Sequence, residues 1–415
     1  MSTIDLIFEG GGAKGMVFVG ALQELFKDGA RTHGRLLGAS AGAITAVTLA
    51  AGYTPDGMLA ALTEKDATGK PIFESFLGEP APFDEDAVRR SAIRKLLADL
   101  NLPFVPDFAE DKIDDFIARQ LEKNPIGRHL FSFVERGGWY SADPFVAWLE
   151  RKLNEVQANG KPRGLGKLTL REFFDATHVE TTLVASDTTA ARMLLLNHRT
   201  APDCPVVWAA RMSMSVPLLW QEVEWRREWG CYYAWNAEQE RLEEGDVAGH
   251  VIVDGGLLSN FPIALFLADR PDVAAIVGPA QSEHVLGLLI DEAIPVPRRP
   301  QSRGGRAIAV GGLRTVQRLH RLVNTTTAAH DNMAIAVFAK HVVRLPAGGY
   351  RTTQFDMTDD ERDDLVAAGR EAMRAFLAQP SLPRGARGIA PPDAFAASDA
   401  ARSLANEAAA AILQR

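Results

Sequence analysis

The first fifty residues alternate short apolar runs with glycine-rich turns. Ile4 to Phe8 is an apolar run of strand length, and apolar residues between Met16 and Phe26 recur at helical spacing. A second apolar run, Arg35 to Ala39, precedes the small residues Ala43 to Ala51, whose composition suits a helix packed closely on a sheet. This order of strand, helix, strand and helix predicts an α/β fold with a parallel sheet covered by helices.

The middle and end of the chain extend this pattern. Ser141 to Asn154 predicts a helix that opens with a capping serine. Thr181 to Ala185 and Met193 to Asn197 predict paired strands around a turn, and Val251 to Val253 predicts a brief strand. Thr358 to Leu377 predicts a helix with acidic residues in its first turn, where the helix dipole favours them.

Two segments differ in composition from the rest. Pro55 to Gly138 is rich in charge and proline, with helical patterns at Ala87 to Leu100 and Asp111 to Glu122, and we interpret it as a helical cap insertion. Residues 379–415 combine a Pro/Gly/Ala-rich linker with an Ala-rich tail. We therefore expect one catalytic domain over residues 1–378.

A candidate nucleophile lies at the end of the second predicted strand. Ser40 stands between Gly38 and Gly42 in the pentapeptide Gly-Ala-Ser-Ala-Gly. Glycines at these positions permit a sharp strand-to-helix turn that exposes the serine hydroxyl for attack on a carbonyl. The alternative interpretation is that Ser40 simply caps the following helix.

A glycine-rich loop follows the first predicted strand and consists of Gly10, Gly11, Gly12, Ala13, Lys14 and Gly15. It matches the dinucleotide-binding spacing, but the next strand carries no acid for a ribose, and Met16 stands where a phosphate-binding loop requires lysine. Consecutive glycine N–H groups can instead converge on an oxyanion, and the amide of Ala41 could add to them. We expect Lys14 to order the loop.

Histidines and one aspartate are candidates for the base. Candidate histidines after Ser40 include four that lie in segments with no recognisable loop motif: His284, His320, His330 and His341. Asp254 is an alternative base, because it ends an apolar run and is followed by Gly255 and Gly256, which permit close approach to another loop. It could equally be a turn aspartate. A carboxylate base needs burial and oxyanion donors, and it suits esters and thioesters better than amides.

Composition excludes several other classes of protein. The 415 residues are 47% hydrophobic and carry a net charge of −8, which argues against nucleic-acid binding. Two cysteines, Cys204 and Cys231, exclude a disulfide scaffold. We find neither a secretory signal pattern nor an apolar stretch long enough to span a membrane, and expect a cytoplasmic protein that could touch a membrane only peripherally.

The three motifs, in this order, resemble the patatin-like phospholipase family. Further similarity lies in the segment Ala209 to Pro217, in Asn260 and Pro262, and in Thr353 to Asp356, and it covers roughly residues 4 to 378. Lys14 departs from the arginine of many relatives, which keeps the charge and loses the bidentate geometry.

The resemblance implies a three-layer fold with a mainly parallel sheet, Ser40 as nucleophile, Asp254 as base and an oxyanion hole from the glycine-rich loop. It implies release of fatty acids from phospholipids or related lipid esters, with no metal or organic cofactor. A thioesterase or transacylase using the same dyad, a catalytically idle lipid- or nucleotide-sensing protein, and a signal-activated effector that degrades membranes remain alternatives.

Two further segments bear on membrane contact. Six aromatic residues lie between Trp220 and Trp235, and they either anchor the protein on a bilayer or pack a hairpin on the core, which we favour. Arginines between Arg298 and Arg321 form a basic run that either contacts anionic headgroups or is simply solvated.

Overall fold

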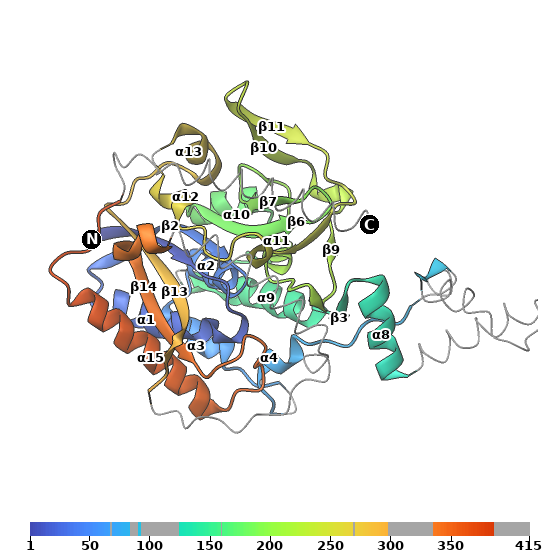
Figure 1. Cartoon of the computed structure of the whole chain (residues 1–415), viewed down its shortest axis with the longest axis horizontal. Helices are drawn as coiled ribbons and strands as arrows, with labels where there is room; N and C mark the ends of the chain where they lie inside the picture. Colours follow the sequence, from blue (N-terminus) through green and yellow to red (C-terminus); the bar gives the residue numbers. More distant parts are fainter. Residues whose placement is uncertain are drawn as a thin grey trace, which may run out of the picture.

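An eight-stranded, mainly parallel sheet runs through the centre of the molecule (Figure 1). The computed structural model describes residues 1–66, 69–83, 90–92, 124–158, 160–268, 270–297 and 335–385. Seven strands follow the order β14, β13, β1, β2, β6, β12 and β9, and β7 pairs with β6 outside this order. The strands are β1 (Ser2–Phe8), β2 (Arg31–Ala39), β6 (Thr181–Asp187), β7 (Arg192–Leu196), β9 (Val223–Glu224), β12 (Val251–Asp254), β13 (His284–Pro295) and β14 (Val342–Gly348).

Side chains on the central strands alternate between two hydrophobic layers. In β1, Ile4, Leu6 and Phe8 face one layer, and Ile7 faces the other. Such burial on both faces is expected of a parallel sheet whose crossover connections are helices. The pairs β1–β2, β1–β13, β2–β6 and β13–β14 are all parallel, so the predicted fold class is confirmed.

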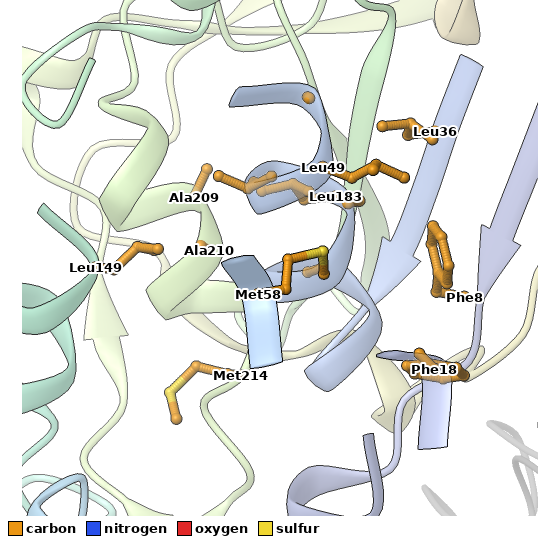
Figure 2. Packing of buried hydrophobic residues seen from close by; sticks show 14 of the residues in the cluster. Phe8, Phe18, Leu36, Leu49, Met58, Leu149, Leu183, Ala209, Ala210 and Met214 are labelled. Atoms are coloured by element: carbon orange, nitrogen blue, oxygen red, sulfur yellow. The ribbon is translucent and has the colours of Figure 1, made fainter. Parts of the chain in front are cut away.

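Helices cover both faces of the sheet. The larger layer holds α1 (Met16–Phe26), α2 (Ala41–Ala51), α9 (Asp143–Glu155), α11 (Val206–Ser213) and α15 (Asp359–Leu377), and part of its packing appears in Figure 2. The opposite layer includes α12 (Ala264–Leu267) and α13 (Pro271–Val277). Together with the sheet, these helices form three layers.

Local chemistry explains several element boundaries. Helix α1 begins and ends at the predicted residues, and α2 begins two residues earlier than predicted, directly after Ser40. Helix α15 begins at a capping box, in which Thr358 accepts the N–H of Glu361 and the Glu361 carboxylate accepts the N–H of Thr358. The predicted paired strands are β6 and β7, which pair antiparallel.

The predicted cap, residues 55–138, is described only in part. Helix α3 (Pro55–Leu62) packs against α1 and α2, and α8 (Pro125–Glu135) packs against β3 (Gly138–Tyr140). The helices expected at 87–100 and 111–122 lie outside the described residues, as does the tail from residue 386 onward. None of the helices within the described ranges is long and apolar enough to span a bilayer.

The aromatic segment is mostly buried. Trp220, Trp225 and Trp229 are each 2% exposed or less. Tyr233 and Trp235 lie half-buried on the hairpin of β10 (Tyr232–Asn236) and β11 (Arg241–Gly245), which projects from the body in Figure 1. The interpretation that this segment packs on the core is therefore confirmed for the three tryptophans. The predicted basic run between residues 298 and 321 lies outside the described residues.

The remaining short elements lie around this body. They are α4 (Ile72–Ser75), α10 (Leu170–Thr177), β4 (Gln157–Ala158), β5 (Lys161–Pro162), β8 (Leu218–Trp220), β10 (Tyr232–Asn236) and β11 (Arg241–Gly245), with 3₁₀ turns at Gly12–Gly15, Arg227–Trp229, Gly255–Leu257 and Ala339–His341.

Close packing of α1 on α15 generates a stability prediction. A Cβ at Gly20 would lie 1.8 Å from the Val366 carbonyl oxygen, so Gly20→Ala forces the helices apart. We expect a loss of roughly 1–3 kcal/mol in the free energy of unfolding, despite the gain of about 1 kcal/mol in helix propensity. Gly245→Ala is the control, since its nearest neighbour is 3.7 Å away. Urea denaturation of both variants tests this; equal stabilities would contradict it.

Candidate active site

Strand register brings Ser40 and Asp254 to one point on β6. Strand β2 runs parallel to β6 and ends with Ala39 opposite Val184. Strand β12 runs antiparallel to β6 and ends with Asp254 opposite Ala185, the next residue along. The carboxyl ends of β2 and β12 therefore meet head to head, and the residue that follows Ala39 is Ser40.

Ser40 occupies a strained turn between β2 and α2. Its backbone has φ 50° and ψ −118°, a conformation that non-glycine residues rarely adopt. Its side chain makes no capping hydrogen bond to the helix, which removes the alternative that Ser40 serves only as an N-cap. Its backbone N–H donates to Ser213 Oγ at 3.0 Å.

The flanking glycines are required by space. A Cβ at Gly38 would come within 2.2 Å of the Gly42 carbonyl oxygen, and one at Gly42 within 2.3 Å of the Phe8 carbonyl oxygen. Backbone contacts as close as these cannot be relieved by a side-chain rotation. The pentapeptide motif is therefore a steric requirement of the turn.

Asp254 is a buried carboxyl group, only 5% exposed. Its Oδ1 accepts the N–H of Gly256 at 2.6 Å, and its Oδ2 is enclosed without a hydrogen-bond partner among the described residues. Burial raises the pKa of Asp254 to about 7, against the opposing effects of the Gly256 N–H and of the nearby Ser40 hydroxyl, both of which lower it. A Cβ at Gly255 would lie 2.4 Å from the Val184 carbonyl oxygen, so this turn also needs its glycine.

The glycine-rich loop lies against both residues. A Cβ at Gly10 would come within 3.1 Å of Ser40 Cβ, and one at Gly15 within 2.7 Å of Ala41 Cβ. Gly12 has φ +54° and leaves no room for a Cβ beside the Thr352 carbonyl oxygen. The loop backbone therefore comes this close to the nucleophile only because Gly10 and Gly15 lack side chains.

Hydrogen bonding narrows the predicted set of oxyanion donors. The N–H groups of Gly10, Ala13 and Lys14 already donate to the carbonyl oxygens of Asn260, Thr352 and Gly11, so they are not free to bind an oxyanion. Within the described ranges, the N–H groups of Gly11, Gly12 and Ala41 have no partner. The Lys14 ammonium is buried and forms an ion pair with Glu292, in agreement with a role in ordering the loop.

Sequence reasoning missed one residue that supports this loop. The Glu9 carboxylate accepts the N–H of Ile290 at 2.6 Å and the Asn260 Nδ2 donor at 3.2 Å. Asn260 Nδ2 also donates to the Gly10 carbonyl oxygen at 2.7 Å. A glutamate directly after an apolar strand and before three glycines was the only signal, and it does not identify a partner.

The two candidate histidines within the described residues, His284 and His341, lie away from Ser40. His284 opens β13 opposite Ile4, and its ring lies 3.1 Å from the Pro383 carbonyl oxygen. His341 contacts the Arg384 carbonyl oxygen at 3.0 Å. Both lie where β13 and β14 begin, whereas Ser40 follows the end of a parallel strand. His320 and His330 lie outside the described residues.

The fold thus brings a serine, a buried carboxyl group and glycine amides together on a three-layer α/β scaffold. Residues 6–267 match the family model of patatin-like phospholipases. The chain therefore belongs to the patatin-like phospholipase family, a family of lipid hydrolases.

The individual proteins to which the chain is similar have low sequence identity to it. The chain is 27% identical over 385 residues to the uncharacterized protein YqhO of Bacillus subtilis (strain 168), covering 91% of this chain and 98% of that protein. Among solved structures it is similar to VipD from Legionella pneumophila, with 18% identity, a TM-score of 0.41, and coverage of 91% of this chain and 67% of that one. ExoU in complex with SpcU from Pseudomonas aeruginosa gives 18% identity, a TM-score of 0.33, and coverage of 91% and 51%.

The raised pKa of Asp254 predicts a stability effect of a definite sign. The native carboxyl group holds its proton more tightly than the unfolded one, whose pKa is about 3.9, so its burial destabilises the native state progressively as pH rises from about 4 to 7. Asp254→Asn removes this penalty. Relative to wild type, we expect the variant to gain roughly 2–3 kcal/mol more stability at pH 8 than at pH 5.

Denaturant titrations of both proteins at the two pH values check this expectation. Asp187→Asn is the control. Burial tends to raise the pKa of Asp187, but hydrogen bonds from His250, Ala190 and Arg192 outweigh it and lower that pKa. A lowered pKa changes stability only as pH falls below about 4, so the titration of Asp187 should make this variant's loss of stability nearly equal at pH 8 and pH 5. A pH-independent difference between Asp254→Asn and wild type would contradict the assignment.

Proposed function

We propose that this protein is a serine acyl hydrolase with a Ser40–Asp254 dyad that releases fatty acids from phospholipids or related lipid esters. One observation carries the proposal: strand register places a serine in a strained strand-to-helix turn beside a buried carboxyl group whose pKa is about 7. A general base is most effective when its pKa is close to the working pH. Family membership supports a lipid substrate.

The proposed reaction has two halves. The Asp254 carboxylate takes the Ser40 proton as Oγ attacks the ester carbonyl carbon, and the carbonyl oxygen becomes an oxyanion. N–H groups of Gly11, Gly12 and Ala41 would stabilise that charge, each donor being worth about 10²–10³ in rate. Collapse breaks the ester bond, Asp254 returns the proton to the leaving alkoxide, and an acyl-enzyme remains.

Water completes the cycle. Asp254 takes a proton from a water molecule that attacks the acyl-enzyme, and the same oxyanion donors act again. The fatty acid leaves as Ser40 regains the proton. The positive end of α2, which begins directly after Ser40, favours the negative charge that develops in both halves.

The nucleophile is tested by Ser40→Ala on phosphatidylcholine vesicles, with fatty acid and lysophospholipid quantified by mass spectrometry. We expect release to fall by at least about 10³-fold with the melting temperature preserved, since the covalent route is lost. Turnover equal to that of wild type would reject Ser40. A wild type that releases no acyl group would instead favour an idle lipid-binding protein, and faster release from an acyl thioester would favour the thioesterase alternative.

Helix α8 offers a surface suited to contact with lipid. Ile126, Leu130 and Val134 are 71%, 43% and 46% exposed, and their spacing of four residues places them on one face of the helix. Phe131 and Ser132 are buried on the other side. An exposed apolar stripe on an amphipathic helix can insert at the boundary between headgroups and acyl chains. We propose that this stripe contacts the bilayer that contains the substrate.

Leu130→Asp tests this contact. Loss of an inserted leucine weakens membrane partition by about 1.5–3 kcal/mol, so we expect vesicle hydrolysis at limiting lipid to fall at least tenfold. Hydrolysis of the soluble ester p-nitrophenyl butyrate should be unchanged. Val337→Asp, at a residue 57% exposed on another segment, is the control. Equal losses on both substrates would argue against membrane contact by α8.

A further inference from the structure

One short segment contacts both members of the proposed dyad. It comprises Ser213, Met214 and Ser215, directly at and after the end of α11. Ser213 Oγ accepts the backbone N–H of Ser40 at 3.0 Å and donates its own proton to the Val184 carbonyl oxygen at 2.6 Å. Ser213 is completely buried. Its hydroxyl group therefore connects the turn that carries the nucleophile to the central strand β6.

This connection acts where the backbone is strained. A non-glycine residue with φ 50° and ψ −118° persists only when its surroundings fix it in place. The Ser40 N–H points into the core, and the Ser213 hydroxyl is its hydrogen-bond acceptor. Because Val184 lies opposite Ala39, this bond anchors Ser40 to the same part of β6 that pairs with Asp254.

The other end of the segment anchors Asp254. The Ser215 carbonyl oxygen accepts the backbone N–H of Asp254 at 2.9 Å. Ser215 Oγ donates to the Arg211 carbonyl oxygen at 2.6 Å and accepts from the Arg211 guanidinium, which also donates to the Gln221 carbonyl oxygen at 2.6 Å. Arg211 is 4% exposed, and its guanidinium holds the neutral oxygens of Ser215 and Gln221 in place.

We propose that Ser213 is a positioning residue for acyl transfer, which holds Ser40 in the attacking conformation through its backbone N–H. This inference rests on the proposed function and adds a residue that acts through the nucleophile. Because Ser213 is buried beneath the turn, it does not touch substrate and should not affect substrate binding. A misplacement of the nucleophile by about 1 Å can lower the rate by about 10²-fold. Loss of the Ser213 hydroxyl should therefore lower kcat and leave KM nearly unchanged.

Ser213→Ala and Ser132→Ala form a matched pair. Each removes a completely buried hydroxyl that donates to a backbone carbonyl oxygen at 2.6 Å, but Ser132 bonds to Gly138, in β3 outside the proposed dyad. With p-nitrophenyl butyrate, we expect Ser213→Ala to lower kcat by about 10–10²-fold, with KM within about twofold of wild type. The pH midpoint of kcat/KM should stay near 7, since Asp254 is unchanged. Ser132→Ala should retain the wild-type kcat, and Ser213→Thr, which keeps the hydroxyl, should restore part of the loss.

A second measurement separates this inference from the proposed function. A fluorophosphonate probe labels an activated serine, and intact-protein mass spectrometry gives the rate at which it labels Ser40. This measurement does not require the natural substrate to be known. Slower labelling of Ser213→Ala than of Ser132→Ala supports the inference, and Ser213→Gly replaces Ser213→Ala if the latter does not fold. An active wild type with unchanged kcat and labelling in Ser213→Ala overturns the positioning role alone. A wild type that neither hydrolyses esters nor becomes labelled overturns both.

Discussion

The pairing of β6 with two different strands along one edge is the constraint on which the rest of the site depends. Strand β2 occupies the first half of this edge and β12 the second, running in the opposite direction, so that both end between Val184 and Ala185. Side-chain period in a strand is two, and a slip by one residue would turn Asp254 to the other face of the sheet. The three-layer core makes such a slip costly, because alternate residues of these strands belong to different hydrophobic layers.

The site carries two local costs that the core has to offset. One is the left-handed conformation of Ser40, of the order of 1–3 kcal/mol. The other is the burial of Asp254 away from any cation among the groups that set its pKa. Both costs have a chemical use in the proposed mechanism. The turn raises the hydroxyl above the sheet, and burial keeps the carboxyl group basic enough to accept a proton near neutral pH.

Local patterns in the sequence were sufficient to predict the helices, strands and motifs, but not to predict which motifs lie together in the fold. Apolar periodicity located α1 to the residue, and the glycines around Ser40 identified its turn because steric clearance at a turn is a local property. The proximity of Ser40 and Asp254 depends on register between strands more than 200 residues apart. The residues themselves offered Asp254 only as one alternative for the base, and family resemblance singled it out. The glycine-rich loop was predicted as a uniform set of donors. Long-range bonds to Asn260 and Thr352 decide which N–H groups stay free, and no local pattern encodes them.

A single carboxyl group also limits which substrates the proposed dyad can serve. After it takes the Ser40 proton, Asp254 is an acid with a pKa of about 7, and it has to pass that proton to the leaving group. An alkoxide leaving from an ester is far more basic than this acid. Proton transfer from Asp254 to the alkoxide is therefore favourable whether it accompanies or follows the breaking of the ester bond. An amide nitrogen must be protonated before its bond to carbon breaks, which demands a proton donor that swings between nucleophile and leaving group. Asp254 is fixed by the Gly256 N–H and by its own backbone bond to Ser215, so it lacks that freedom. The rigidity that aligns the dyad therefore favours esters over amides.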